Sequence, residues 1–446
     1  MMTKTTTVPK NVYELAQERL RIVFNEFDNV YLSFSGGKDS GVLLSLCIDY
    51  IRRNNLKIKL GVFHMDYEIQ YKMTIDYIAR MLEDNKDILE VYRVCVPFRV
   101  ATCTSMYQSF WRPWEDSKKD LWVRPLPENA MTKEDFPFYN TQMWDYEFQM
   151  RFASWLHEKK DAVRTCCLIG IRTQESFNRW RCIYLNRKYQ MYHRYRWTSK
   201  VGNDIFNAYP IYDWKTTDVW TANGKFKWDY NKLYDYYYWA GVNLERQRVA
   251  SPFIGEAQES LALYRAIDPN TWGKMIGRVN GVNFTSMYGG THAMGWQSIK
   301  LPEGYTWREF MYFLLSTLPD RARNGYLRKL QVSVQFWRNK GGCLSDETIR
   351  RLNEAKVPII VMDNSNYKTT KKPVRMEYQD DIDIPEFREI PTYKRMCICI
   401  LKNDHACKYM GFSPNKSETQ RRNKIMEKYE SLLQPSDKSN VPEPCL

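Results

Sequence analysis

The part of this sequence best suited to chemistry is a short run of serine, glycine, lysine and aspartate. Paired glycines let a backbone turn tightly, so that several N–H groups can face one anion. The hydroxyls can donate hydrogen bonds, the lysine supplies a positive charge, and the aspartate could hold Mg²⁺ together with phosphate oxygens. The run therefore predicts a loop that binds the phosphates of ATP or a related adenylyl compound. Its residues are Ser35, Gly36, Gly37, Lys38, Asp39 and Ser40.

The elements on either side of this run favour the same interpretation. An apolar stretch at residues 30–34 predicts a strand, and the pattern from Gly41 to about Arg53 predicts a helix. The positive end of that helix would add to anion binding. An ordinary strand-to-helix turn is the alternative, but six consecutive residues of the right types make it the weaker one. The pattern is not that of a Walker A loop.

Strand and helix signals alternate through the first half of the chain. Strands are predicted near residues 59–65, 89–96 and 165–169, and helices near 11–27, 70–82 and 143–157. This alternation predicts an α/β, Rossmann-like parallel sheet with helices on both faces. Residues 98–140, rich in proline and tryptophan, are expected to form a long inserted loop.

The loop resembles the PP-loop motif of ATP pyrophosphatases and phosphoadenosine phosphosulfate (PAPS) reductases. Phe63-His64-Met65-Asp66 resembles a His-x-Asp segment of that superfamily that helps to hold the nucleoside. Residues 170–179 are similar to a Gly-x-Arg-x-x-Glu-Ser-x-x-Arg signature of sulfate adenylyltransferase small subunits and PAPS reductases. The resemblance implies an adenine nucleotide alpha hydrolase-like fold. It also implies nucleotide contacts by Asp66, Gly170, Arg172, Glu175 and Arg179.

The arginines of this signature have a clear chemical role. Arg172 and Arg179 can fork onto phosphate or sulfate oxygens, and Glu175 can orient them. With Lys38 and Asp39 they are the expected catalytic residues. Segments at 210–220 and 231–235, the second reading Asn-Lys-Leu-Tyr-Asp, are also similar to those of the reductases.

Beyond residue 235 the chain resembles a branch of PAPS reductase-like proteins with a long extra domain. Some members of that branch are described as co-activators of prophage gene expression, which implies a ParB-like partner. We expect a nucleotide-binding domain at 1–225, a mainly helical, aromatic-rich region at 226–330 and a C-terminal region at 331–446.

Two departures from the reductases argue against thioredoxin-dependent PAPS reduction. The Glu-Cys-Gly-Leu/Ile-His segment that supplies their thiol is missing, and the loop has the full form typical of ATP-splitting members. The sequence favours an enzyme that splits ATP to AMP and pyrophosphate, to adenylate or sulfur-modify an acceptor. The alternative is a nucleotide-responsive regulator that binds nucleic acid or a ParB-like partner.

A second group of reactive side chains lies near the C-terminus, at Cys397, Cys399, His405 and Cys407. Four such ligands could hold zinc or an iron–sulfur cluster, but the spacing is not a standard one for either. Buried thiols on a strand are the simpler interpretation.

Residues 178–200 hold five Arg, two Lys and six aromatics, and no acid. Basic groups interleaved with aromatics suit a flexible nucleic acid, through phosphate contacts and base stacking. The alternative is that the aromatics pack beside the sheet. A basic helix near residue 417 could extend the same surface.

The composition limits the class of protein. The chain has 446 residues, a net charge of +14 and a pI near 9.1, which suits polyanionic partners. No signal peptide or membrane-spanning run is evident, and 11 cysteines show no disulfide rhythm. We therefore expect a cytoplasmic protein without a membrane partner.

Overall fold

The computed structural model describes residues 10–184, 190–244, 247, 249, 251–254, 257, 261–288, 299–363 and 371–412. The chain divides into two compact units, residues 1–298 and 299–446. The basic helix expected near residue 417 lies outside the described residues.

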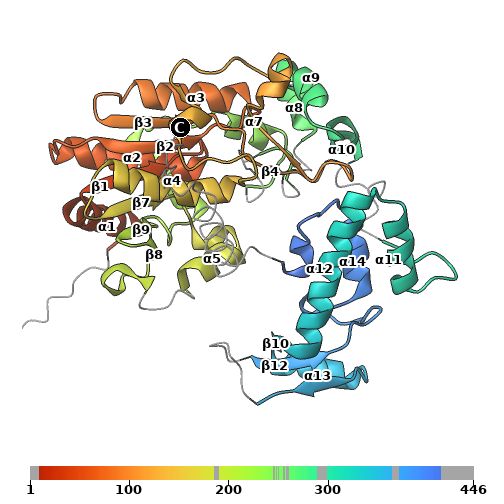
Figure 1. The fold of residues 1–446 in the computed structure, drawn as a ribbon. Coiled ribbons are helices and arrows are strands. Elements are labelled where there is room, and N and C mark those ends of the chain that lie inside the picture. The colour runs from red at the N-terminus through yellow and green to blue at the C-terminus, as the bar shows by residue number, and fades with distance from the viewer. Residues whose placement is uncertain are drawn as a thin grey trace, which may run out of the picture. The chain divides into compact units, whose positions relative to one another are not determined.

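The first unit is built on a sheet with helices on both faces (Figure 1). Its elements are α1 (Val12–Glu26), β1 (Asn29–Ser33), α2 (Lys38–Arg53), β2 (Leu60–Met65), α3 (Lys72–Glu83), β3 (Leu89–Val94), β4 (Val100–Ala101), β5 (Phe110–Trp111), β6 (Ala130–Met131), α4 (Asp145–Lys159), β7 (Thr165–Ile169), α5 (Phe177–Tyr184), β8 (Thr198–Gly202), β9 (Ile205–Ala208), α6 (Thr216–Phe226), α7 (Leu233–Trp239), α8 (Leu263–Ile267), α9 (Pro269–Arg278) and α10 (Val282–Tyr288).

The strand order places the carboxyl ends of β1 and β7 side by side. Within the described residues, seven strands form one sheet in the order β6-β3-β2-β1-β7-β9-β8. All neighbours are parallel except β8 and β9. The chain adds β2, β3 and β6 on one side of β1 and then returns to add β7 on the other. In open parallel sheets, such a switch point is where ligands bind, beyond the carboxyl ends of the strands.

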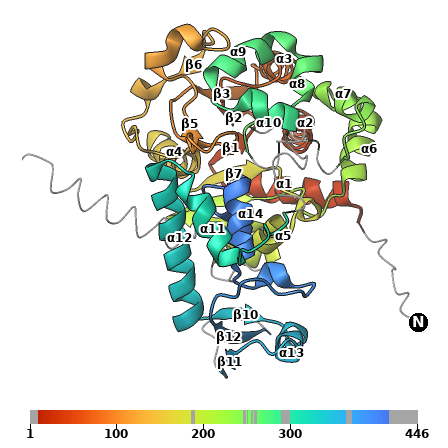
Figure 2. The same ribbon diagram turned by 90° about the vertical axis from the view of Figure 1, so that its right-hand side faces the viewer.

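Alternate side chains of the strands enter two different cores. On one face, Leu32 and Val62 pack with apolar residues of α1, α2, α3 and α6. On the other, Tyr31 and Phe63 pack with α4 and with residues of α7 to α10. Figure 2 gives a second view of the sheet and its helices. The predicted fold class, a Rossmann-like sheet covered on both faces, is confirmed.

The inserted segment is more ordered than a plain loop. Its strands β4 and β5 pair with each other, and β6 pairs in parallel with β3 at the edge of the sheet. The two-residue length of β6 explains why no strand pattern is visible in the sequence.

The second unit combines helices with a small antiparallel sheet. Its elements are α11 (Trp307–Ser316), α12 (Asp320–Asn339), β10 (Gly342–Leu344), α13 (Asp346–Glu354), β11 (Ile359–Val361), β12 (Lys372–Met376) and α14 (Tyr393–Leu401). Side chains of α11, α12 and α14 form one apolar core, and α13 packs on the sheet in another. The strand predicted for Cys397 and Cys399 is wrong: Thr392 caps the start of α14, and both cysteines lie on this helix.

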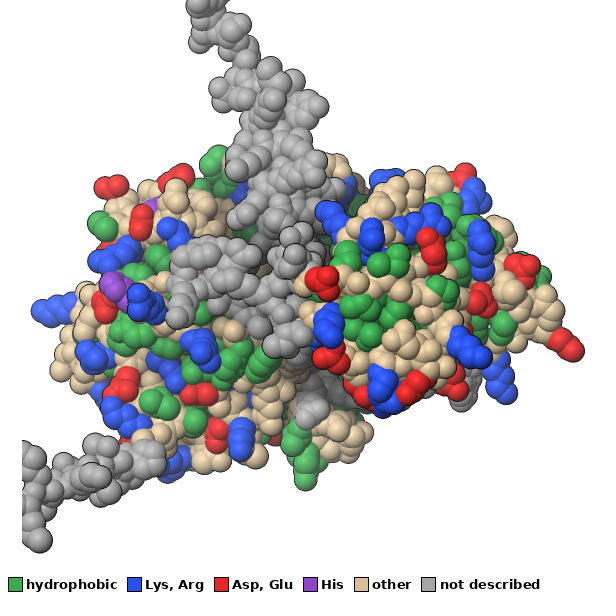
Figure 3. All heavy atoms as spheres, turned by 90° about the horizontal axis from the view of Figure 1, so that it is seen from below, with side chains coloured by type: hydrophobic (Ala, Val, Ile, Leu, Met, Phe, Trp, Pro, Cys, Tyr) green, Lys and Arg blue, Asp and Glu red, His purple; other side chains and the backbone are tan. Residues whose placement is uncertain are grey.

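Surface charge is mixed on the face shown in Figure 3. There, Lys and Arg side chains are interspersed with Asp and Glu. In the described part of the chain, no helix is both long and apolar enough to cross a bilayer.

Candidate functional site

The Ser/Gly loop connects β1 to α2, and the backbone N–H groups at the start of this helix receive no side-chain cap from Gly37. Gly36 has a φ of +74°, which a residue with a side chain rarely adopts. Gly37 is the N-cap of α2 and, having no side chain, supplies no capping acceptor. The N–H of Gly37 donates to Ser35 Oγ at 3.3 Å, and that of Lys38 donates to Tyr234 Oη at 3.0 Å. The N–H groups of Asp39 and Ser40, also in the first turn, gain no cap from Gly37 and suit an anion.

Side chains within the loop fix its shape. Ser35 Oγ and Ser40 Oγ lie 3.0 Å apart, and the Ser35 N–H donates to Ser40 Oγ at 3.3 Å. Tyr77 Oη would lie 2.4 Å from a Cβ at position 41, so α3 packs against Gly41. These contacts support the observed conformation of the loop.

Asp39 and Arg172 form a buried ion pair across the switch point. Arg172 Nε–H donates to Asp39 Oδ1 at 2.6 Å, and the arginine side chain is 1% exposed. Lys38 Nζ lies 3.3 Å from Asp39 Oδ2. Burial lowers the pKa of Lys38, Asp39 opposes this shift, and Arg172 and Arg179 add to it. The sequence signature at 170–179 therefore meets the loop, and the phosphate contacts expected of Arg172 and Arg179 stay predictions.

Gly170 allows this close approach. A Cβ at position 170 would lie 2.9 Å from the carbonyl carbon and oxygen of Asp39 and from the Ser40 nitrogen. Only glycine lets the end of β7 approach the first turn of α2 so closely. Of the remaining predicted residues, Glu175 accepts the Arg172 N–H at 3.4 Å and forms an ion pair with Arg179.

Two residues that contact the loop were not predicted as part of the site: Asn231, just before α7, and Tyr234, on α7. Asn231 Nδ2 donates to the Gly36 carbonyl at 3.0 Å and to Thr74 Oγ1 at 2.9 Å. Tyr234, whose burial raises its pKa, accepts the Lys38 N–H. The similarity of the segment at 231–235 to the reductases was the available signal, but a contact made across some 195 residues has no local pattern.

His64 lies in β2, the neighbour of β1, and Asp66 directly follows this strand; both side chains are buried. His64 Nδ1 lies 2.8 Å from the Phe34 carbonyl oxygen, and Nε2 has no partner among the described residues. Burial lowers the pKa of His64, although Asp66 opposes this, so the ring is neutral near pH 7. Nδ1 then donates, which leaves Nε2 as an acceptor beside the loop.

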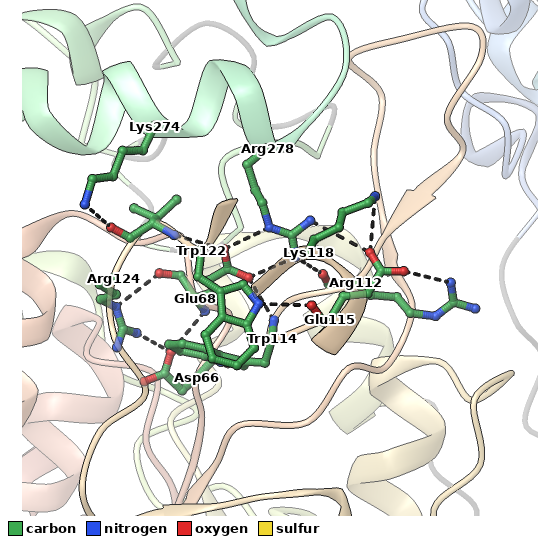
Figure 4. A network of polar contacts seen from close by, with 11 residues as sticks. Asp66, Glu68, Arg112, Trp114, Glu115, Lys118, Trp122, Arg124, Lys274 and Arg278 are labelled. Atoms are coloured by element: carbon green, nitrogen blue, oxygen red, sulfur yellow. Dashed lines mark hydrogen bonds and ion pairs between the residues drawn. The ribbon is translucent and has the colours of Figure 1, made fainter. Parts of the chain in front are cut away.

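Asp66 anchors a network rather than pointing freely into the site (Figure 4). Its carboxylate is 0% exposed and forms ion pairs with Arg93, at 3.1 Å, and with Arg124. Burial would raise the pKa of Asp66, but Arg124, His64 and Arg93 together bring it below its ordinary value. Its backbone carbonyl accepts the Trp114 Nε1–H at 2.7 Å. The nucleoside contact implied for Asp66 stays a prediction.

Only part of the Cys/His group comes together, because the thiols of Cys399 and Cys407 are hydrogen-bonding neighbours. Cys397 Sγ bonds the Trp307 carbonyl at 3.5 Å, and Cys399 Sγ bonds Asp404 Oδ2 at 3.7 Å. His405 stacks on Tyr326 with ring centroids 5.7 Å apart. Across the described ranges no group of three or more His, Cys, Asp or Glu side chains could hold a metal.

The basic, aromatic segment at 178–200 is partly core and partly surface. Tyr192 and Trp197 are buried beside the sheet. Trp180 and Tyr184 are each 38% exposed and stack at 5.2 Å, and Arg196 lies over the Tyr184 ring at 5.1 Å. Arg187 and Lys188 lie outside the described residues.

A Rossmann-like sheet with a Ser-Gly-Gly-Lys-Asp-Ser loop at its switch point defines a PP-loop fold. Two family models match consecutive parts of the chain. Residues 29–240 match a phosphoadenosine phosphosulfate reductase domain, and residues 241–421 match a domain of unknown function, DUF3440. The Escherichia coli (strain K12) protein titled "Uncharacterized protein YbdN" is 33% identical over 420 residues, which are 93% of this chain and 94% of that one. The chain belongs to this family of PAPS reductase-like proteins with a DUF3440 region.

Solved structures also resemble part of the chain. A PAPS reductase from Candida auris, in a phosphate complex, is 13% identical over 52% of this chain and 94% of that one, with a TM-score of 0.27. An FMN adenylyltransferase from Candida glabrata, in complex with ATP, is 12% identical over 52% of this chain and 63% of its own, with a TM-score of 0.30. A U34-tRNA thiolase, NcsA, from Methanococcus maripaludis is 12% identical over 62% of this chain and 79% of its own, with a TM-score of 0.29.

Proposed function

We propose that this protein binds ATP through residues 35–40 and splits it between the α- and β-phosphates. The observation that carries the proposal is the start of α2, where a glycine N-cap leaves first-turn N–H groups for an anion while Lys38 and Arg172 lie beside them. An acceptor nucleophile would attack the α-phosphorus and form the adenylated product. The bond to the β-phosphate would break, and pyrophosphate would leave with the bonding electrons.

Lys38, Asp39 and Ser40 of the loop, together with Arg172 and Arg179, would take part in this reaction. The N–H groups of Asp39 and Ser40 and the Lys38 ammonium would bind the pyrophosphate and stabilise the charge that develops on it. Arg172 would hold Asp39 in place through their 2.6 Å bond. Mg²⁺, bound mainly by the nucleotide, would meet the Asp39 carboxylate and neutralise phosphate charge. Arg179, with its side chain 36% exposed, would contact the phosphates or the acceptor.

The test is incubation with ATP and Mg²⁺, scoring AMP and pyrophosphate, with and without nucleic acid. We expect AMP and pyrophosphate in equal amounts, with water attacking the α-phosphorus in place of the missing acceptor, and little ADP or phosphate. Release of ADP and phosphate as the main products would contradict the proposal.

We expect no thioredoxin-dependent reduction of PAPS. Such a reaction needs a thiol of lowered pKa on an accessible segment. Burial instead raises the pKa of Cys397 to about 12 and holds that of Cys399 well above its usual value. Cys445 lies outside the described residues. Thioredoxin-dependent sulfite release that vanishes on replacing one of these cysteines would overturn this expectation.

A second candidate function is that of a nucleotide-responsive regulator that binds nucleic acid. The exposed stack of Trp180, Tyr184 and Arg196 supports it, because unpaired bases stack on such rings and phosphates pair with arginine. Trp180 and Tyr184 of this stack lie on α5, and Trp180 directly follows Arg179, a residue of the proposed nucleotide site. The ParB-like partner implied by the resemblance would belong to this role and stays a prediction.

Salt dependence tests this second role. Each phosphate neutralised should contribute a slope of roughly −0.7 to −0.9 in log K against log salt. Trp180→Ala with Arg196→Ser should weaken binding of a single-stranded oligonucleotide, whereas Trp239→Ala, an exposed aromatic of α7, should not. Binding that is flat in salt, or undiminished in the first variant, would reject the role.

A further inference from the structure

The Glu68 carboxylate joins three segments that are far apart in the sequence (Figure 4). It is 0% exposed. Arg278 donates from Nε to Oε1 at 2.9 Å and from Nη2 to Oε2 at 3.0 Å. The inserted segment adds two backbone donors, the N–H of Trp114 at 2.8 Å and that of Val123 at 3.2 Å. A carboxylate this deeply buried is stable only because every one of these donors is in place.

Arg278 comes from α9, which lies in the region that matches the domain of unknown function. Its side chain is 1% exposed. Besides the two bonds to Glu68, its Nη2 donates to the Arg112 carbonyl at 2.6 Å. The arginine therefore binds both the segment after β2 and the insertion.

Other residues of the same region pack against the nucleotide-binding sheet. Asp268 Oδ2 accepts the Lys72 N–H at 2.8 Å, at the start of α3. Tyr264 stacks on Tyr71 with ring centroids 3.6 Å apart. Tyr264, Met275 and Val279 share a core with strand residues of the sheet. The compact unit ends only at Ser298, well inside the matched region.

This network borders the proposed nucleotide site. Asp66 directly follows β2, the neighbour of β1, and its Oδ1 accepts the Glu68 N–H at 3.0 Å. Arg124 donates to the Glu68 carbonyl at 3.1 Å and pairs with the Asp66 carboxylate. The conformation of residues 66–68 is thus set by the insertion on one side and by Arg278 on the other.

We infer that the first part of the DUF3440 region, through α10, is a structural component of the nucleotide-binding unit, and that Arg278 is a positioning residue. By holding Glu68, Arg278 fixes the segment after β2 and the insertion at the side of the site where the nucleoside would lie. The effect on the nucleotide rests on the proposed function, whereas the positioning of the two segments does not.

The chemistry of the pair predicts how variants will behave. Arg278→Met keeps most of the volume but leaves the Glu68 charge buried with only neutral donors. Arg278→Lys keeps the charge but cannot form the bidentate pair with Glu68. This variant should therefore hold the two segments better than Arg278→Met does, but less well than the wild type. Glu68→Gln combined with Arg278→Met removes both charges and should disturb the fold less than Arg278→Met alone. Arg338→Met is the matched control, because it removes an ion pair with Glu377 that is exposed and lies in the second unit.

Hydrogen exchange of the full chain tests the positioning without any nucleotide. In Arg278→Met we expect the amides of Trp114 and Val123, and the segment 66–68, to exchange about tenfold faster or more. Arg278→Lys should lie between this variant and the wild type, and Arg338→Met should match the wild type. Unchanged exchange of these amides in a folded Arg278→Met protein would overturn the inference.

Affinity for a non-hydrolysable ATP analogue tests the consequence for the site. In the same Arg278→Met protein we expect the affinity for the analogue to fall about two- to thirtyfold. The affinity of Arg278→Lys should lie between those of Arg278→Met and the wild type. Faster exchange with full affinity would overturn the positioning role for the nucleotide. If the wild type binds no adenine nucleotide, the proposed function fails, and hydrogen exchange alone still decides whether Arg278 holds the two segments.

Discussion

The phosphate loop and the segment from Cys397 to Cys407 both gather reactive side chains in a short stretch of sequence, yet they differ in what those side chains contact. In the loop, Asp39 meets Arg172 from a distant segment, and Gly37 supplies no side-chain cap to the first turn of α2. In the C-terminal segment, Cys397 and Cys399 each bond a different neighbour within an apolar core. Most side chains of both groups are buried, with Ser35 exposed and His405 half-buried, but only in the loop site do the contacts join a strand-to-helix turn to a distant segment.

The difference lies in the elements that carry the side chains. Parallel strands β1 and β7 are neighbours, so the residues that follow them meet at the same edge of the sheet. On α14, two residues that are two positions apart point in widely different directions. Proximity in sequence therefore indicates a site less reliably than proximity at the ends of adjacent strands.

The largest expected effect concerns the ion pair that joins the two halves of the loop site. Arg172→Met should lower the free energy of unfolding by about 3 kcal/mol, because Asp39 loses its hydrogen-bonded arginine partner and keeps only the Lys38 ammonium, 3.3 Å away. Arg179→Met, which removes a more exposed pair, should cost about 0–1 kcal/mol. Urea unfolding followed by fluorescence measures both. Equal losses in the two variants would show that the site is not organised around Arg172.

A smaller effect is expected from the close approach of β7 to α2. Gly170→Ala places a Cβ against the backbone of Asp39. The steric clash should destabilise the observed conformation of the loop by about 1–3 kcal/mol. ATP affinity should fall by the corresponding factor, about fivefold to 150-fold. The control is Gly224→Ala in α6, where the structure places nothing within 4 Å of a new Cβ. Calorimetric titration of both variants with ATP measures the two affinities. Equal affinities would contradict the expected role of Gly170 in shaping the loop.

The thiols should be slow to react. Because burial raises the pKa of Cys397 to about 12, the folded protein at pH 8 should hold only about one part in 10⁴ of this group as thiolate. Iodoacetamide should modify Cys397 readily only after unfolding, and mass spectrometry of digested peptides can measure this. Rapid modification in the folded protein would place the thiol at an accessible, activated position instead.

The smallest effect is expected from metal removal. Cys397, Cys399, His405 and Cys407 do not form a ligand group, so treatment with 1,10-phenanthroline should leave the thermal unfolding midpoint unchanged. A midpoint lowered by the chelator and restored by zinc would show that the second unit holds a metal after all.

The strands and the loop could be predicted from the sequence because their signals are local. Residues 165–169 were expected as a strand and are β7, and Ser35 to Gly37 form the turn between β1 and α2. Helix α2 begins at Lys38, three residues before the expected Gly41, because the lysine, aspartate and serine of the loop form its first turn. Apolar periodicity cannot detect a first turn made of polar residues.

The remaining features depend on distant parts of the chain. No local pattern indicates that Tyr234 would contact Lys38 or that Arg278 would pair with Glu68. The predicted strand at Cys397 failed because a short apolar run suits a strand and a buried helix equally well. The cap at Thr392 decides for the helix.

Binding of an ATP analogue that cannot be split between the α- and β-phosphates tests the central claim most directly, since it needs no acceptor. We expect the wild type to bind it in the presence of Mg²⁺, and the Asp39→Ala, Ser40→Ala double variant to bind about ten- to 100-fold more weakly. Asp49→Ala, which removes a carboxylate from the far part of the same helix, should bind like the wild type. Unchanged affinity in a folded double variant would contradict the assignment of residues 35–40 as the nucleotide site.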